Sequence, residues 1–333
     1  MPRSFGQLIV CAALSAAAVL AQTKPVFEVA TIKPSPPLDM VKLAADIRAG
    51  HMPKMGAHID ASRAEYTFLV LRDLIVLAYG VKPNQVSGPP WLTTQRFDIL
   101  AKLPENTRKE QVPGMLQALL EERFKLKVHR ETAEHPVLGL VVGKGGPKLK
   151  ESAQTPSPID QSIPLKEGEM ETEGPDGPVR TQIGKDGSAV INMGSKGKMS
   201  YKMDPATQSF HLEGEMISMS GFADMLTQFS QMGGSGGKRI VDMTGLKGNY
   251  QVSIDFSIAE LIQMARAAGM DIPGGPGAPA APGGNPAESA SDPSGSSSSV
   301  LTAVQSLGLK FEPRKAMIEQ LIVDSMEKTP TDN

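Results

Sequence analysis

The sequence predicts an α+β fold of two related units, each a small mixed sheet with two helices on one face, joined by a long irregular linker. Three observations predict it. Apolar residues recur at helical spacing in some segments and alternate at strand spacing in others. Each half of the chain runs strand, helix, strand, helix, strand, strand. Residues 112–142 also resemble residues 298–324, which indicates an internal repeat. A single sheet shared by both units is the alternative packing.

The first 21 residues are typical of a secretory signal peptide. Arg3 supplies a positive charge, residues 8–20 are apolar, and Ala21 ends an acceptable small-residue cleavage site. The apolar run is shorter than the roughly 20 residues that span a bilayer. The mature protein is therefore expected in the periplasm or outside the cell, with no membrane insertion after signal removal. The only cysteine, Cys11, lies in this segment, so disulfides and a thiol nucleophile are excluded from the mature chain.

The first unit is predicted over residues 22–150. Its apolar patterns predict strands at 27–32, 96–103, 125–130 and 137–142, and helices at 67–79 and from Val112 onward. A further short helical stretch is possible at 41–47, and residues 51–60 are expected to form a loop. Gly80 follows the first long helix, where a left-handed glycine commonly ends a helix.

Residues 151–205 are polar, rich in Pro and Gly and aperiodic, which predicts an irregular linker. The second unit is predicted over residues 206–328. It contains expected strands at 210–215, 239–243, 250–256, 309–311 and 318–323, and helices at 220–232, 258–268 and 300–307. Residues 271–299 interrupt it with a low-complexity stretch of Gly, Pro, Ala and Ser.

Seven runs together resemble one known family: FEVATIKP, LRDLIVLAYGV, GPPWLTTQRFDILAKLP, MLQALLEERFKLKVHRET, GGPKLK, RIVDMTGLKGNYQVSIDF and the C-terminal run from Leu301. The chain is similar to a soil-associated bacterial family of secreted proteins of unknown function, whose domains are also appended to beta-lactam-sensor-type membrane metallopeptidases. The resemblance implies an exported domain and supplies no catalytic residues. More loosely, the element order is similar to the short N-terminal domains of secretins and TonB-dependent receptors, which are protein-interaction modules.

One short enzyme motif matches the sequence, but the predicted elements around it are not those that the motif requires. Residues 233–237 match G-x-S-x-G, yet the pattern requires a strand before it and a helix after it, and the reverse is predicted here. The formal net charge of −2 argues against nucleic acid as the main partner. No catalytic residue and no cofactor is assigned.

Two clusters contain potential metal ligands. His51, Met52, Met55 and His58 combine imidazoles with thioethers, which suit copper, although their spacing is not diagnostic. His129 and Glu131 share one face of a predicted strand, where charged surface residues are the commoner explanation.

The sequence thus favours a secreted, non-enzymatic binding or protein-interaction module of the cell envelope. Its partner is an unknown envelope protein or a small ligand. Trp91 and Asp242 are the candidates for a binding surface. Two alternatives stay open: a secreted hydrolase with a site between the units, built from residues such as His129, Glu131 and Asp242, and a periplasmic copper-binding protein.

Overall fold

The computed structural model describes residues 25–37, 39–49, 54–184, 186–204, 209–232, 239–257 and 302–331. The predicted signal peptide, the helix expected at 258–268, the low-complexity stretch and the G-x-S-x-G motif lie outside these residues. The described part of the chain is mostly β, with three sheets. No helix in it is long and apolar enough to cross a membrane.

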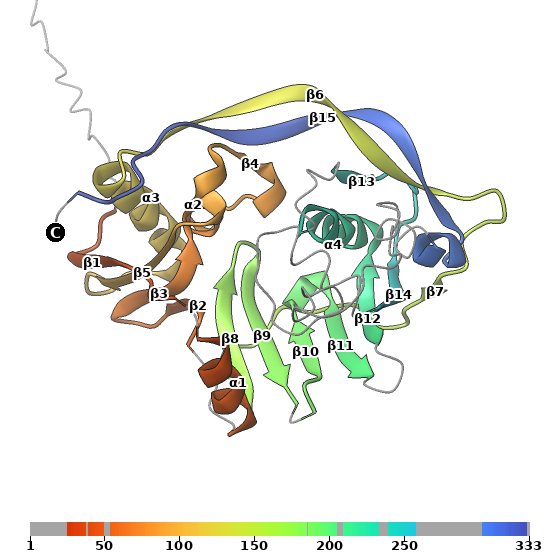
Figure 1. Ribbon diagram of the computed structural model, residues 1–333, viewed down its shortest axis with the longest axis horizontal. Helices are drawn as coiled ribbons and strands as arrows, with labels where there is room; N and C mark the ends of the chain where they lie inside the picture. Colours follow the sequence, from red (N-terminus) through yellow and green to blue (C-terminus); the bar gives the residue numbers. More distant parts are fainter. Residues whose placement is uncertain are drawn as a thin grey trace, which may run out of the picture.

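Two long strands join the molecule from end to end. Strand β6 (Lys127–Val142) and strand β15 (Leu309–Ser325) pair antiparallel along almost their whole length, from Leu309 opposite Val142 to Ser325 opposite Lys127. We call this pair the ribbon. In Figure 1 it arches over two separate groups of elements, which we call the first and second lobes.

The first lobe is an antiparallel sheet in the order β1-β5-β3-β2, covered by α2 and α3. Its core contains apolar residues of the sheet and both helices, with Leu321 and Val323 of the ribbon. The elements of this lobe and its connections are β1 (Val29–Pro34), α1 (Met40–Arg48), β2 (Gly56–Ile59), β3 (Arg63–Val70), α2 (Leu71–Tyr79), η1 (Pro83–Gln85), β4 (Val86–Ser87), η2 (Pro90–Thr93), β5 (Arg96–Lys102), η3 (Lys109–Gln111) and α3 (Val112–Arg123).

The second lobe is a seven-stranded antiparallel sheet in the order β7-β14-β12-β11-β10-β9-β8, with α4 against it. Its core includes Phe222 of α4 together with Leu140 and Leu309 of the ribbon. The elements are β7 (Lys150–Glu151), β8 (Glu169–Gly174), β9 (Gly177–Ile183), β10 (Ala189–Asn192), η4 (Gly194–Lys196), β11 (Lys198–Asp204), β12 (Ser209–Ser218), α4 (Met219–Met232), β13 (Ile240–Asp242) and β14 (Asn249–Ser257).

The ribbon is bordered by one short parallel strand at each end. Strand β4 pairs with β15 at Leu321, and β13 pairs with β6 at Leu138. The third sheet, in the order β13-β6-β15-β4, therefore combines strands from both halves of the chain. It is the only mixed sheet among the described residues.

The predicted fold class is wrong. The two lobes do not each contain a small mixed sheet with two helices on one face, because their own sheets are antiparallel and the mixed sheet is shared. The segment 151–205 is also not irregular, since it contains β8, β9, β10 and β11. Every residue of β8 is half-buried, so the strand does not have one buried and one exposed face.

Several predicted elements are confirmed. The strand at 96–103 corresponds to β5, the helix beginning at Val112 to α3, and the helix at 220–232 to α4. Gly80 ends α2 in the left-handed conformation, with φ 59°. The helix predicted at 67–79 begins only at Leu71, because residues 67–70 complete β3. The loop expected at 51–60 contains strand β2.

Candidate functional site

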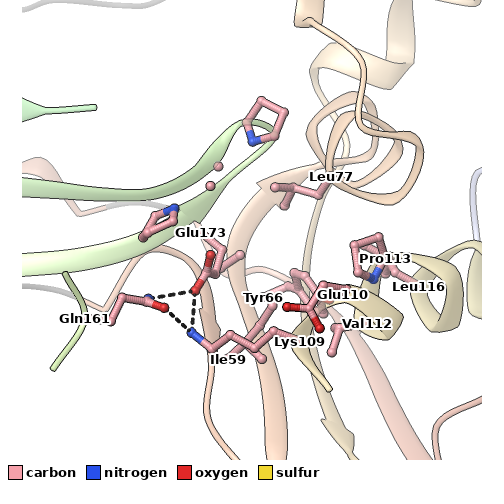
Figure 2. Close-up of a pocket in the computed structure, with 15 residues that line it drawn as sticks. Ile59, Tyr66, Leu77, Lys109, Glu110, Val112, Pro113, Leu116, Gln161 and Glu173 are labelled. Atoms are coloured by element: carbon pink, nitrogen blue, oxygen red, sulfur yellow. Dashed lines mark hydrogen bonds and ion pairs between the residues drawn. The ribbon is translucent and has the colours of Figure 1, made fainter. Parts of the chain in front are cut away.

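A well-defined cavity lies between the first lobe and the hairpin formed by β8 and β9. Its volume is about 430 Å³, within the range of small-molecule sites. Figure 2 shows the helical wall with Leu77, Pro113 and Leu116 facing the hairpin. The residues that line it come from β2, β3, α2, η3, α3 and the hairpin region: Ala57, Ile59, Tyr66, Leu77, Lys109, Glu110, Val112, Pro113, Leu116, Gln161, Glu173, Gly174, Pro175, Gly177 and Pro178.

The walls of this inter-lobe cavity are mainly apolar because α2, α3 and the hairpin each direct apolar side chains toward it. Helices α2 and α3 turn Leu77 and Leu116 away from solvent, and Leu116 is fully buried. Pro113 sits in the first turn of α3, where a missing backbone N–H costs nothing. Pro175, between β8 and β9, and Pro178, at the start of β9, line the cavity from the hairpin. Rigid rings and aliphatic side chains thus form two facing walls.

One end of the cavity is polar. Lys109 Nζ donates to Glu173 Oε1 at 2.9 Å and to Gln161 Oε1 at 3.0 Å (Figure 2). Gln161 also donates to Glu171 at 2.7 Å. Arg180, only 8% exposed, binds Glu171 Oε2 at 2.8 Å through its Nε. This network ties the first lobe to the hairpin and holds its charged groups in fixed positions.

Tyr66 supplies a neutral hydroxyl to the same cavity. Its side chain is 2% exposed, and no described residue hydrogen-bonds its hydroxyl. Burial raises the pKa of Tyr66 above its usual value, and the nearby carboxylate of Glu173 raises it further. The phenol therefore stays protonated and can both donate and accept a hydrogen bond.

The family described as "Protein of unknown function (DUF3738)" matches residues 72–326. The chain belongs to the DUF3738 family. No curated protein and no solved structure matches it. The DUF3738 match begins at the second residue of α2, so β1, β2 and β3 precede it, and Ala57, Ile59 and Tyr66 contribute to the cavity from outside the matched range.

The hydrolase residues predicted from the sequence do not come together in the DUF3738 structure. Asp242 lies on β13 opposite Leu140, near one end of β6. His129 lies at the other end of β6, roughly 35 Å away at about 3.3 Å per residue. The side chain of Asp242 forms a turn, accepting from the backbone N–H of Thr244 at 2.9 Å and from its hydroxyl at 2.7 Å.

His129 pairs with Asp324 across the ribbon, with Nδ1 2.8 Å from the carboxylate oxygen. Both side chains are about half exposed, and Glu131 is exposed beside them. Such a pair is typical of a surface ion pair, which adds little to stability. No group of three or more His, Cys, Asp or Glu residues with metal-binding geometry occurs in the described ranges.

The predicted copper cluster is only partly described. His51 and Met52 lie outside the described residues, Met55 is half-buried before β2, and His58 lies on β2. The Nδ1 atom of His58 is buried without a hydrogen-bond partner among described residues. The DUF3738 structure therefore leaves the metal prediction open.

Trp91 lies in η2 and packs against the first core. The ammonium of Lys328 lies 5.8 Å from the centre of its ring. Trp91 does not line the inter-lobe cavity.

Five polar residues of the cavity were missed from the sequence, namely Tyr66, Lys109, Glu110, Gln161 and Glu173. One signal was available for Tyr66. Arg63, Ala64, Glu65 and Tyr66 alternate polar and apolar, as a strand with one buried face requires. Gln161 and Glu173 belong to the segment predicted to be irregular, so their approach to Lys109 depends on a strand pairing that the sequence does not reveal.

Proposed function

We propose that this DUF3738 protein is a non-enzymatic binding module of the cell envelope, and that the inter-lobe cavity holds a small, mainly apolar ligand with one polar end. The observation that carries the proposal is the cavity of about 430 Å³ with two apolar walls and a single polar end. Ligand sites of this kind combine an apolar lining with a few fixed polar groups that set orientation.

The ligand class follows from the lining. Proline rings and leucine side chains favour a flat or cyclic apolar body, because such a body contacts both walls with little loss of side-chain freedom. The Tyr66 hydroxyl offers one neutral hydrogen bond, and Lys109, Gln161 and Glu173 already satisfy one another. A hydroxyl, amide or carbonyl group suits this end better than a full charge.

The location of the protein is part of the proposal. The first 21 residues have the pattern of a cleaved signal peptide, which would place the mature chain outside the cytoplasm. There the module would meet a small envelope ligand. The alternative partner, an envelope protein, would instead bind an outer surface and would leave the cavity unaffected.

Binding of a neutral aromatic dye tests the cavity. We expect N-phenyl-1-naphthylamine to bind the mature protein with one-to-one stoichiometry and to gain fluorescence, because it fits apolar walls and carries one N–H group. The substitution Leu77→Trp fills the cavity and should weaken binding at least about fivefold. Leu100→Trp is the matched control, since Leu100 is 52% exposed and lies outside the cavity.

Equal dye affinity in the two tryptophan variants would place the dye elsewhere and overturn the assignment of the cavity. The non-enzymatic part has its own test. Ester hydrolysis by the purified protein that is lost in His129→Ala, or in His211→Ala, would show a catalytic site. His211 is included because its Nδ1 also pairs with a carboxylate, that of Asp255, at 2.7 Å.

A further inference from the structure

A second cavity, of about 290 Å³, lies on the other side of the same hairpin tip. Gly174, Pro175 and Gly177 line both cavities, so the tip of the β8–β9 hairpin separates them. The opposite wall of the second cavity is formed by α4 and the end of β12. Lys82 and Asn84 close it from the first lobe. All residues that line it lie within the DUF3738 match.

The floor of the second cavity is apolar. It contains Val179 of β9, Met199 of β11, Ile217 of β12 and Met225 of α4. Ile217 is 2% exposed and Met225 is 8% exposed, so these side chains are fixed in the second core and only part of their surface faces the cavity. Methionine adapts its shape easily, which suits a flexible alkyl chain.

Two lysines from different lobes face the same cavity. Lys82 comes from the first lobe, just before η1, and Lys196 comes from η4 of the second lobe. Each has one carboxylate partner, Asp224 for Lys82 and Asp176 for Lys196. An ammonium group has three donors, so each lysine retains donors for a ligand. The contact between Lys196 and Asp176 is long, at 3.5 Å, and exposed, so it competes weakly with a ligand.

The positive charge near Lys82 exceeds the negative charge. Asp224 interacts with Lys82 and also with the guanidinium of Arg239. The Nη1 atom of Arg239 is buried and has no hydrogen-bond partner among the described residues. Two cations thus share one carboxylate. The described first turn of α4 contains no acidic residue that would offset this excess.

We propose that the second cavity binds a single-chain amphipathic anion, with its alkyl chain on the methionine-rich floor and its head group between Lys82 and Lys196. A carboxylate or phosphate head group would exchange water for ammonium donors, and charge-assisted hydrogen bonds of this kind are among the stronger ones in proteins. The chain would be shielded from solvent by Ile217 and Met225. This site is separate from the one proposed for the neutral ligand.

Calorimetric titration of the mature protein tests the ligand class. We expect decanoate to bind with one-to-one stoichiometry and at least about tenfold more tightly than decanol, acetate or decyltrimethylammonium. The affinity for decyl phosphate, compared with the affinity for decanoate, then distinguishes a phosphate-bearing lipid from a fatty acid as the natural ligand. If decanol or decyltrimethylammonium binds as tightly as decanoate, the head group is not recognised by the lysines and the proposal is overturned.

Substitutions locate the site. Lys196→Gln should weaken decanoate binding at least about fivefold and leave the fold intact, because the ion pair that Lys196 makes with Asp176 is exposed. Lys315→Gln is the matched control, since Lys315 is an exposed lysine that binds Glu134 on the ribbon, away from both cavities. An equal effect of the two substitutions would overturn the proposal.

Leu77→Trp separates this proposal from the previous one. Leu77 lines only the first of the two cavities, so decanoate affinity should not change in this variant. Loss of decanoate binding in Leu77→Trp with full retention in Lys196→Gln would place the anion in the first cavity and overturn the second site. Failure of the dye to bind the unmodified protein would instead affect only the proposed neutral ligand.

Discussion

The two lobes share a local plan and differ in what is added to it. In each lobe a bulged strand contains one non-glycine residue with positive φ, Phe68 at 59° in β3 and Met216 at 58° in β12. A helix begins three residues later, at Leu71 and at Met219. Each lobe also contributes one short strand to the edge of the ribbon: β4 pairs parallel with β15, and β13 pairs parallel with β6.

The difference is the width of the second sheet. Beyond β12 it continues through β11, β10 and β9 to β8, whereas the first sheet ends at β2. The added strands return to the first lobe, where a Cβ atom on Gly56 of β2 would lie 3.0 Å from the side chain of Thr172 in β8. Both cavities are lined by the hairpin of this extension. The shared parts therefore provide the scaffold, and the unshared strands form the candidate binding sites.

Two single core substitutions on the ribbon, one in each core, give the largest expected effect and test whether the lobes unfold together. Leu140 is fully buried in the second core and Leu321 is 2% exposed in the first. We expect Leu140→Ala and Leu321→Ala each to lower the free energy of unfolding by about 2–5 kcal/mol. Because each strand of the ribbon enters both cores, the two losses should appear in one cooperative transition.

The only tryptophan makes this measurable in urea. Trp91 packs against the first core, so its fluorescence reports the first lobe. Leu140→Ala should shift the Trp91 transition as far as it shifts the far-ultraviolet circular dichroism transition. Met317→Ala, on the same ribbon but 65% exposed, should change stability by less than about 0.5 kcal/mol. A Trp91 transition unmoved by Leu140→Ala would mean that the lobes unfold independently.

Two helix-ending glycines give an intermediate effect and contrast the lobes again. Gly80 ends α2 with φ 59°, and Gly308 follows the last helical turn, residues 302–306, with φ 73°. A Cβ atom at Gly80 meets nothing within 4 Å, so Gly80→Ala should cost only the left-handed backbone penalty, about 1–2 kcal/mol.

Gly308→Ala should cost clearly more. The new Cβ atom would collide with the backbone oxygen of Gly146 and would lie 2.8 Å from the backbone nitrogen of Lys148. Backbone atoms cannot move aside as a flexible side chain can. Urea midpoints of the two variants provide the comparison, and equal losses would show that the turn at Gly146 yields without cost.

The sequence predicts most elements of the shared plan but not the extension. Helix α3 and strand β5 follow from apolar spacing because one face of each is buried. The resemblance between residues 112–142 and 298–324 does not reveal that the two segments pair with each other, since strand pairing over such a separation is set by the whole fold. Strand β8 is half-buried along its entire length, so its burial has no period that identifies a strand. Because this segment was predicted to be irregular, Gln161 and Glu173 were not predicted as cavity residues.

An acid titration gives the smallest expected effect and compares one turn in each lobe. Asp60, before β3, accepts from the backbone N–H of Ser62 at 2.7 Å and from its hydroxyl at 2.9 Å. Asp186, before β10 in the extension, makes the same two bonds to Ser188, at 3.1 Å and 2.6 Å. The backbone bond from Ser62 is the main cause that lowers the pKa of Asp60 to about 2, and the Ser188 hydroxyl is the main cause that lowers the pKa of Asp186.

A carboxyl whose pKa is lower in the folded state stabilises the fold above its unfolded pKa of 3.8, and this contribution disappears as pH falls through the folded value. Asp60→Asn should therefore lower the urea midpoint slightly at pH 7 and progressively less between pH values of about 4 and about 2. Asp186→Asn should show the same direction. A loss that is equal at both ends of this range would mean that the turn is held by the geometry of the side chain and not by its charge.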